Sequence, residues 1–237
     1  MLTLIEALNY RCLKYVRQPL SPFHVLVGPN ASGKTTFLDV VSLLGRLVSS
    51  GLKEALAERA PTFDDLLYLG KGNKFELAVE ARIPDHLLDA VKTSKSTFQV
   101  IRYEVSIEKD SETEEVMLLG ESVRLKTSQE VKSVKRQLFP SPPPPPDTIF
   151  ERKQQGTRTT VNKVHCGNDN FYSETYTTSG KGWAPAFKLG PLKSALGNLP
   201  EDESKFPVST WLKGLLSDGI HQVILESLAM RKASKPG

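Results

Sequence analysis

Eight consecutive residues near the start of the sequence are of the types that hold phosphate groups: Gly28-Pro29-Asn30-Ala31-Ser32-Gly33-Lys34-Thr35. They satisfy the pattern G-x-x-x-x-G-K-[ST], in which a loop wraps around the phosphates of a nucleotide. Gly28 and Gly33 have no Cβ, so the backbone can approach the phosphates closely and direct its N–H groups at them. A helix beginning near Gly33 would aim its unpaired N-terminal amides at the same anion. These residues predict a triphosphate site.

The side chains of this loop, residues 28–36, have separate expected roles. Lys34 is expected to reach the β- and γ-phosphates, and the Thr35 hydroxyl to bind a Mg²⁺ ion that bridges them and keeps most of its waters. Thr36 can donate a hydrogen bond to a more remote phosphate. A glycine-rich turn that matches the pattern by chance is the alternative. The predicted ligands are ATP and Mg²⁺, and the predicted binding residues are Gly28, Asn30, Ala31, Ser32, Gly33, Lys34, Thr35 and Thr36, with Thr35 as the metal ligand.

Such a loop lies between a strand and a helix, and the sequence indicates both. The apolar run at residues 23–27 predicts the strand. Residues 36–48 carry apolar side chains at helical spacing, and Gly51 is a plausible stop. Residues 2–8 predict an earlier strand, followed by a loop at residues 18–22.

The pattern changes near Gly72, where strand signals replace the alternation of strand and helix. Period-two alternation over residues 74–83, 101–107 and 117–125 predicts an antiparallel meander with one polar face. Residues 148–164 and 171–178 predict further strands, and helical signals return from Phe187, at residues 211–216 and 222–230. The expected divisions are a phosphate-loop core at 1–72, a β-rich region at 73–186 with a proline-rich spacer at 140–146, and a helical segment at 187–237.

Composition bounds the class of protein without revealing its chemistry. The 237 residues include 31 basic and 27 acidic side chains, a net charge of +4 that does not by itself indicate nucleic-acid binding. Between Leu125 and His165, however, the sequence contains eight basic residues and three acidic ones. This excess leaves open either a DNA-facing or a solvated surface. Cys12 and Cys166 are too far apart to indicate a disulfide framework or a zinc site. His165 beside Cys166 makes only two potential ligands, and His24 and His221 are interpreted as structural.

Targeting signals are not evident. Residues 1–9 lack a basic leader and a cleavage site, and no apolar run is long enough to cross a membrane. We therefore expect a cytoplasmic location and no membrane partner.

Three short motifs carry a resemblance to a known family. Asn30 within the loop, the turn Leu8-Asn9-Tyr10-Arg11, and Phe63-Asp64-Asp65-Leu66-Leu67 resemble the ABC-type ATPase heads of the RecF, SMC and OLD group, including AAA-family ATPases of prokaryotes related to OLD proteins. The resemblance implies an α/β P-loop NTPase, here the N-terminal lobe of an ABC-type head with an antiparallel β-rich insertion. It also implies a nucleotide held in a dimer, with possible DNA as partner in repair or defence.

Hydrolysis in such heads needs a second lobe, with an apolar strand ending in Asp-Glu and a signature loop. Val223-Ile224-Leu225-Glu226 is the nearest run but lacks the acid pair. Leu216-Ser217-Asp218-Gly219 looks like the signature loop, and an ordinary helix N-cap at Ser217 or Asp218 is the alternative. We assign no catalytic residue, and we expect a homodimer or a partner chain to supply the second lobe.

ATPase activity of this chain alone is left open. The alternative is a non-hydrolysing ATP-binding module of a split or degenerate ATPase. A nucleotide or small-molecule kinase ranks below both, because the sequence has no recognisable lid of paired arginines.

Overall fold

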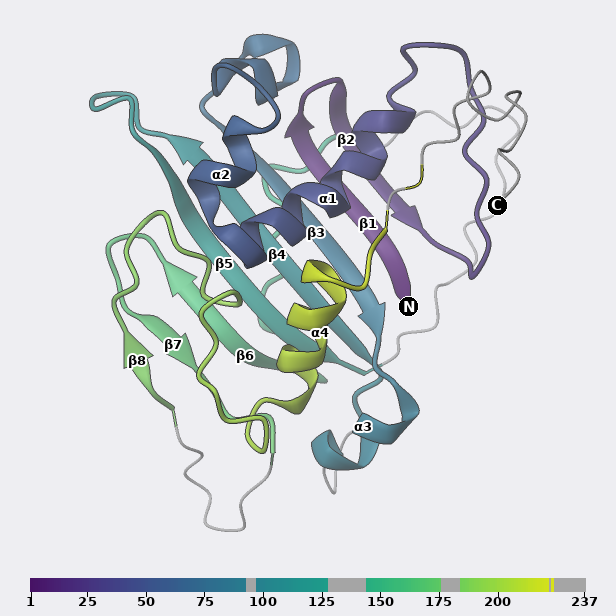
Figure 1. Ribbon diagram of the computed structural model, residues 1–237, viewed down its shortest axis with the longest axis vertical. Coiled ribbons are helices and arrows are strands. Elements are labelled where there is room, and N and C mark those ends of the chain that lie inside the picture. The colour runs from purple at the N-terminus through teal and green to yellow at the C-terminus, as the bar shows by residue number, and fades with distance from the viewer. Residues whose placement is uncertain (93–96, 128–143, 176–183, 222, 224–237) are drawn as a thin grey trace, which may run out of the picture.

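One eight-stranded antiparallel sheet forms the body of the computed structural model, which describes residues 1–92, 97–127, 144–175, 184–221 and 223. The strand order is β2-β1-β3-β4-β5-β6-β7-β8, and every neighbouring pair is antiparallel. Figure 1 shows the helices α1, α2 and α4 lying over one face of this sheet. Because β1 pairs with β3, the sheet crosses the sequence division expected at residue 72.

The strands are β1 (Leu2–Tyr10), β2 (Leu13–Pro19), β3 (Lys74–Arg82), β4 (Val100–Lys109), β5 (Val116–Lys126), β6 (Thr157–Val164), β7 (Asp169–Phe171) and β8 (Ala186–Phe187). The helices are α1 (Lys34–Ser50), α2 (Leu52–Ala57), α3 (Asp85–Val91) and α4 (Pro207–Ser217), with two short 3-10 helices, η1 (Asp64–Leu66) and η2 (Tyr68–Gly70).

The helix-facing side of the sheet is the main core, and it follows the predicted alternation. In β3, Phe75, Leu77 and Val79 are fully buried, and their partners in β4 include Tyr103 and Val105, which are buried as well. Successive side chains of a strand point to opposite faces, so one apolar set can meet the helices while the other set is polar. The predicted meander of β3, β4 and β5 is confirmed.

Close backbone contact holds α1 against its neighbours. Gly45 of α1 lies so near the carbonyl of Leu216 at the end of α4 that a Cβ would collide with it. Gly197 makes the same kind of approach to the carbonyl of Val48. The predicted stop at Gly51 is confirmed, because this residue caps α1 with a backbone hydrogen bond to Leu47. The helix therefore has a fixed position over the sheet.

The polar face of the meander is covered, which the sequence pattern did not predict. Glu76 of β3 and Arg102 and Glu104 of β4 are all buried, with Arg102 only 1% exposed. Residues 148–154 lie against this face, and the backbone N–H groups of Ile149 and Glu151 donate to Glu76 and Glu104 at 2.7 and 2.9 Å. The charges pair with one another, so Arg102 donates to Glu104 at 2.6 Å. Pairing and hydrogen bonding make burial of these charges tolerable.

Other expectations about the elements need correction. The strand predicted over 148–164 begins only at Thr157, because the backbone of 148–154 bonds to side chains instead of a strand. Helix α4 contains the predicted 211–216 segment, but Phe187 belongs to β8. Strand β2 was not predicted. Most of the helix expected at 222–230, most of the proline-rich spacer and residues 176–178 lie outside the described residues, and Val223, which is described, belongs to no helix.

Candidate functional site

The 28–36 loop leads directly into α1, as the sequence predicts. Helix α1 begins at Lys34, and Gly33 before it has a left-handed backbone with φ 88°. Ala31 is also left-handed, with φ 63°. The N–H of Ser32 donates to the carbonyl of Pro29 at 3.3 Å, which closes the loop on itself. The chain therefore makes a tight turn immediately before the helix.

The ammonium of Lys34 folds back over this turn. Its Nζ donates to the carbonyl oxygens of Gly28 at 2.8 Å and Pro29 at 2.7 Å, and to Ser32 Oγ at 3.2 Å. All three acceptors are neutral. The loop thus holds a full positive charge in contact with its own backbone.

Both glycines of the motif have a steric reason in the structure. A Cβ on Gly28 would lie 2.8 Å from Ser32 Oγ, which is closer than such contacts occur. A Cβ on Gly33 would lie 3.1 Å from Cys12 Sγ, in addition to the strain of its positive φ. The backbone therefore requires glycine at position 33, whereas the contact at Gly28 is with a serine hydroxyl that can rotate away.

The start of α1 is suited to an anion. No side chain caps the helix N-terminus, and its first turn contains no acidic residue. The backbone N–H groups there and the positive end of the helix dipole both favour negative charge. Thr35 is exposed in this first turn, whereas Thr36 accepts a contact from Cys12 Sγ at 3.4 Å. This end of the helix can hold a phosphate by backbone groups, with the charge of Lys34 beside them.

The turn between β1 and β2 braces the same helix. Tyr10 is fully buried, and its hydroxyl donates to Asp39 of α1 at 2.5 Å. Arg59 Nε donates to the other carboxylate oxygen, Oδ1 of Asp39, at 2.9 Å. Arg11 Nη1 lies 3.7 Å from Oδ2, the oxygen that accepts from Tyr10. Burial, and then the negative charge of Asp39, raises the pKa of Tyr10 above its ordinary value. The hydroxyl therefore stays protonated and keeps donating.

Sequence reasoning missed Cys12, Asp39 and Arg59. The sequence signal available was the turn Asn9-Tyr10-Arg11. In the structure, Asn9 and Arg11 of this turn both have positive φ. Such backbone strain is retained where the surroundings fix it. The pattern marks the turn but does not reveal which helix residue it contacts.

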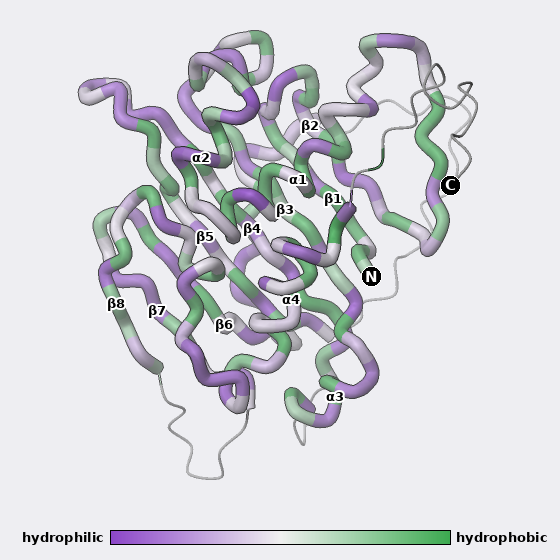
Figure 2. Tube along the Cα trace, in the orientation of Figure 1, coloured by the Kyte–Doolittle hydropathy of each residue, from purple (hydrophilic) through white to green (hydrophobic). Residues whose placement is uncertain are grey.

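The strand predicted before the loop is not formed. Residues 23–27 belong to no strand, and the side chains of Phe23, Val25 and Val27 are 83%, 61% and 89% exposed. Figure 2 shows this hydrophobic run at the right of the view, apart from the sheet. Apolar composition favours a strand only where a neighbour supplies backbone partners, and no described strand lies beside this one.

Other candidates from the sequence are placed as follows. Ser217 ends α4 and Asp218 follows it, so the N-cap interpretation is wrong and both residues lie at a helix C-terminus. Val223 is exposed, and residues 224–226 lie outside the described part of the chain.

Cys166 Sγ lies 3.0 Å from His165 Nε2 at the surface. In the described ranges no cluster of three or more potential ligands could hold a metal, and no helix could span a membrane.

The basic stretch from Leu125 to His165 does not form one continuous charged surface in the described residues. Lys126 pairs with Glu80 and Glu151, and Lys163 pairs with Asp169 at 2.7 Å. Arg152 and Lys153 are exposed. Lys132, Lys135 and Arg136 lie outside the described residues.

Comparison with known proteins identifies the relatives of this chain. A model of the AAA ATPase domain family matches residues 1–174. An OLD nuclease of Thermus scotoductus is 43% identical over 44 residues, which are 19% of this chain and 8% of that protein. A solved SMC ATPase structure, studied for ATP-driven dimerization and DNA stimulated activation, is 21% identical, with a TM-score of 0.37 over 53% of this chain and 69% of that chain. The chain thus matches only a small part of its curated relative, and the predicted resemblance to OLD-type ATPases is confirmed.

Proposed function

This chain belongs to the AAA ATPase domain family, and from that premise we propose that its 28–36 loop binds ATP together with Mg²⁺. The observation that carries the proposal is the Lys34 ammonium, which lies in contact with the loop's own oxygens just before a helix whose first turn has no acid and no side-chain cap. Two sources of positive potential, the ammonium and the helix dipole, thus lie together.

The Lys34 ammonium would form stronger hydrogen bonds with a triphosphate than with the carbonyl oxygens of the loop. Phosphate oxygens carry negative charge, and charge-assisted hydrogen bonds are roughly twice as strong as those to neutral carbonyls. Lys34 would exchange Gly28 and Pro29 for the β- and γ-phosphates, while the backbone N–H groups of residues 30–34 surround them.

Thr35 is the residue that would hold Mg²⁺. Its side chain is exposed in the first turn of α1, and one hydroxyl suits an ion that takes its other ligands from phosphates and water. The bound ion would neutralise phosphate charge. Equilibrium dialysis with ATP tests this: Mg²⁺ should tighten binding to the wild type but not to Thr35→Ala. An equal gain for both proteins would contradict the assignment.

Hydrolysis, in this proposal, depends on a second chain. Asp39 is the acid on α1, and its two oxygens already accept from Tyr10 and Arg59, so it is not available to activate water. The exposed apolar residues 23–27 offer backbone and side chains on which a partner strand can pair. A second copy, or a chain carrying the other lobe, would supply the catalytic acid next to the loop.

The alternative is an ATP-binding module that never hydrolyses. Steady-state phosphate release by the purified chain separates the two, with Lys34→Ala as the control for contaminating activity. An ATPase completed by a second copy is supported if phosphate release depends on Lys34 and if its rate rises more than in proportion to the concentration of the chain. ATP binding without turnover at any concentration supports the module or a different partner chain.

A role in DNA handling follows only from the relative, which is named a nuclease. We propose it for the complete assembly, with the exposed Arg152 and Lys153 as the described residues available for phosphate contact. Retention of duplex DNA by the chain with Mg-ATP, and its decrease with added salt, tests this role. No retention at low salt would contradict it.

A further inference from the structure

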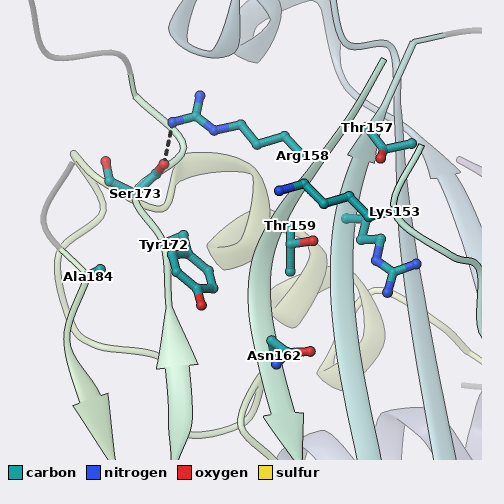
Figure 3. Close-up of a pocket in the computed structure, with 9 residues that line it drawn as sticks. Lys153, Thr157, Arg158, Thr159, Asn162, Tyr172, Ser173 and Ala184 are labelled. Atoms are coloured by element: carbon teal, nitrogen blue, oxygen red, sulfur yellow. Dashed lines mark hydrogen bonds between the residues drawn. The ribbon is translucent and has the colours of Figure 1, made fainter. Parts of the chain in front are cut away.

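A polar cavity lies at the other side of the sheet from the strands β1 and β2 that adjoin the 28–36 loop. Its volume is about 640 Å³, within the range of small-molecule sites. It covers the ends of β5, β6 and β7 on the face away from the helices, since Thr159 and Asn162 are register partners of Arg124 and Ser122 on that face. Figure 3 shows Tyr172, Thr159 and Asn162 along its floor, with Lys153 and Arg158 above. Its lining residues are Arg124, Lys153, Thr157, Arg158, Thr159, Asn162, Tyr172, Ser173 and Ala184.

One wall of this cavity is held rigidly. It consists of residues 151–154, in which Glu151 N–H donates to the buried carboxylate of Glu104 at 2.9 Å. Arg124 donates to the carbonyl of Glu151, and Gln154 N–H donates to Thr157 Oγ1 at 3.2 Å. These hydrogen bonds therefore fix the backbone on both sides of Lys153.

The charge of the lining has one sign. Arg124, Lys153 and Arg158 come from β5, the wall and β6, and the lining contains no acid. Arg158 is oriented by the carbonyls of Ser173 and Glu174, which accept from it at 2.6 and 2.8 Å. Lys153 is exposed, and in the described part of the chain it makes no ion pair. Arg124 also lies 3.7 Å from the buried carboxylate of Glu104, so Lys153 is the lining cation that is available to an anion.

The remaining lining identifies the rest of the ligand. Tyr172 is 40% exposed and presents its ring to the cavity beside Thr159 (Figure 3). An aromatic face of this kind stacks with a planar ring. The amide of Asn162 and the hydroxyl of Thr159 can donate and accept hydrogen bonds. The polar edge of a heterocyclic ring needs both kinds of partner.

We propose that this cavity binds a nucleoside phosphate, with the phosphate on Lys153 and the base stacked on Tyr172. The same chemistry is offered by a free nucleotide and by the terminal nucleotide of a single strand. The proposal does not rest on the function of the 28–36 loop.

The experiment uses the full chain carrying Lys34→Ala, so that binding at the 28–36 loop is suppressed. Adenosine 5′-monophosphate, which lacks the β- and γ-phosphates, is titrated without magnesium and binding is followed by equilibrium dialysis. We expect binding that weakens about tenfold when Lys153→Ala removes the charge-assisted hydrogen bond. Tyr172→Leu should weaken it comparably, and Lys71→Ala, which removes an exposed cation outside the lining, should not.

A 5′-phosphorylated single-stranded oligonucleotide and inorganic phosphate are the other two arms. Tighter binding of the oligonucleotide, with the same dependence on Lys153 and Tyr172, supports a strand end as the source; tighter monophosphate supports a free nucleotide. Inorganic phosphate binding as tightly as the nucleotide would overturn the nucleoside assignment. No binding, or binding that ignores both substitutions in variants with unchanged thermal unfolding, would overturn the site.

Discussion

The buried hydroxyl of Tyr10 donates to the Asp39 carboxylate at 2.5 Å and thereby ties the turn after β1 to the helix that follows the 28–36 loop. Arg59 bonds the other oxygen of the same carboxylate. Three segments distant in sequence are therefore joined behind the helix whose N-terminus faces the proposed phosphates. The position of that N-terminus depends on this contact.

Replacing Tyr10 by phenylalanine should lower the free energy of unfolding by about 2 kcal/mol, because a hydrogen bond from a fully buried hydroxyl to a carboxylate is lost. Denaturant unfolding measures the change. Tyr15→Phe is the matched control: its hydroxyl donates to Glu6 at 3.0 Å, nearer the surface, and we expect a loss of less than about 1 kcal/mol. Equal losses in the two variants would contradict the special role of the contact with Asp39.

Gly33→Ala should weaken ATP binding at least about tenfold, since both the left-handed backbone and the contact with Cys12 oppose a Cβ. Gly72 is a matched control, because it has the same φ of 88° but no atom within 4 Å of the position that a Cβ would take. Gly72→Ala should therefore lose some stability and keep its affinity for ATP. If both variants bind ATP like the wild type, the loop does not need its observed conformation.

Stability should fall between pH 5 and pH 7 through Glu174. Burial raises the pKa of this carboxyl to about 7, although Ser209 and Val208 at the start of α4 hydrogen-bond to it. The unfolded chain releases the proton near 4.5 and the folded chain near 7, so the folded state binds more protons in this window and its stability decreases as pH rises. The contribution is about 3 kcal/mol.

Glu174→Gln should flatten that decrease, because glutamine does not titrate. Urea unfolding at pH 5, 6 and 7 measures the free energy for both proteins. The comparison uses the slope with pH, so a constant loss from replacing the carboxyl does not affect it. Parallel curves for the variant and the wild type would show that Glu174 is not the titrating group.

The exposed residues 23–27 should matter for assembly and not for folding. Phe23→Ser with Val27→Ser removes side chains that contact little, so the free energy of unfolding should change by no more than about 0.5 kcal/mol. Sedimentation velocity with Mg-ATP should show self-association of the wild type and its loss in the double variant. Phe37→Ser, at a buried position of α1, should instead destabilise the fold. Unchanged association of the double variant would argue against this segment as the partner surface.

Sequence patterns predicted the parts of the fold that depend on local order. Alternation located β3, β4 and β5 to within a residue or two, and helical spacing located α1 and its end at Gly51. The 28–36 loop was found because its chemistry requires fixed residue types at fixed spacing.

What could not be predicted depends on contacts distant in sequence. Alternation identifies a polar face but not what covers it, so the buried Arg102 and Glu104 looked like solvated residues. Residues 23–27 have strand composition, yet a strand also needs a neighbour. Asp39 showed no signal, because its importance comes from Tyr10, 29 residues away.

Calorimetric titration of the chain with Mg-ATP tests the central claim most directly. The wild type should release heat in a saturable, single-site isotherm, and Lys34→Ala should bind at least about tenfold more weakly, while Lys53→Ala on α2 should match the wild type. A wild-type titration without heat at several temperatures, or binding that Lys34→Ala leaves unchanged, would contradict the account.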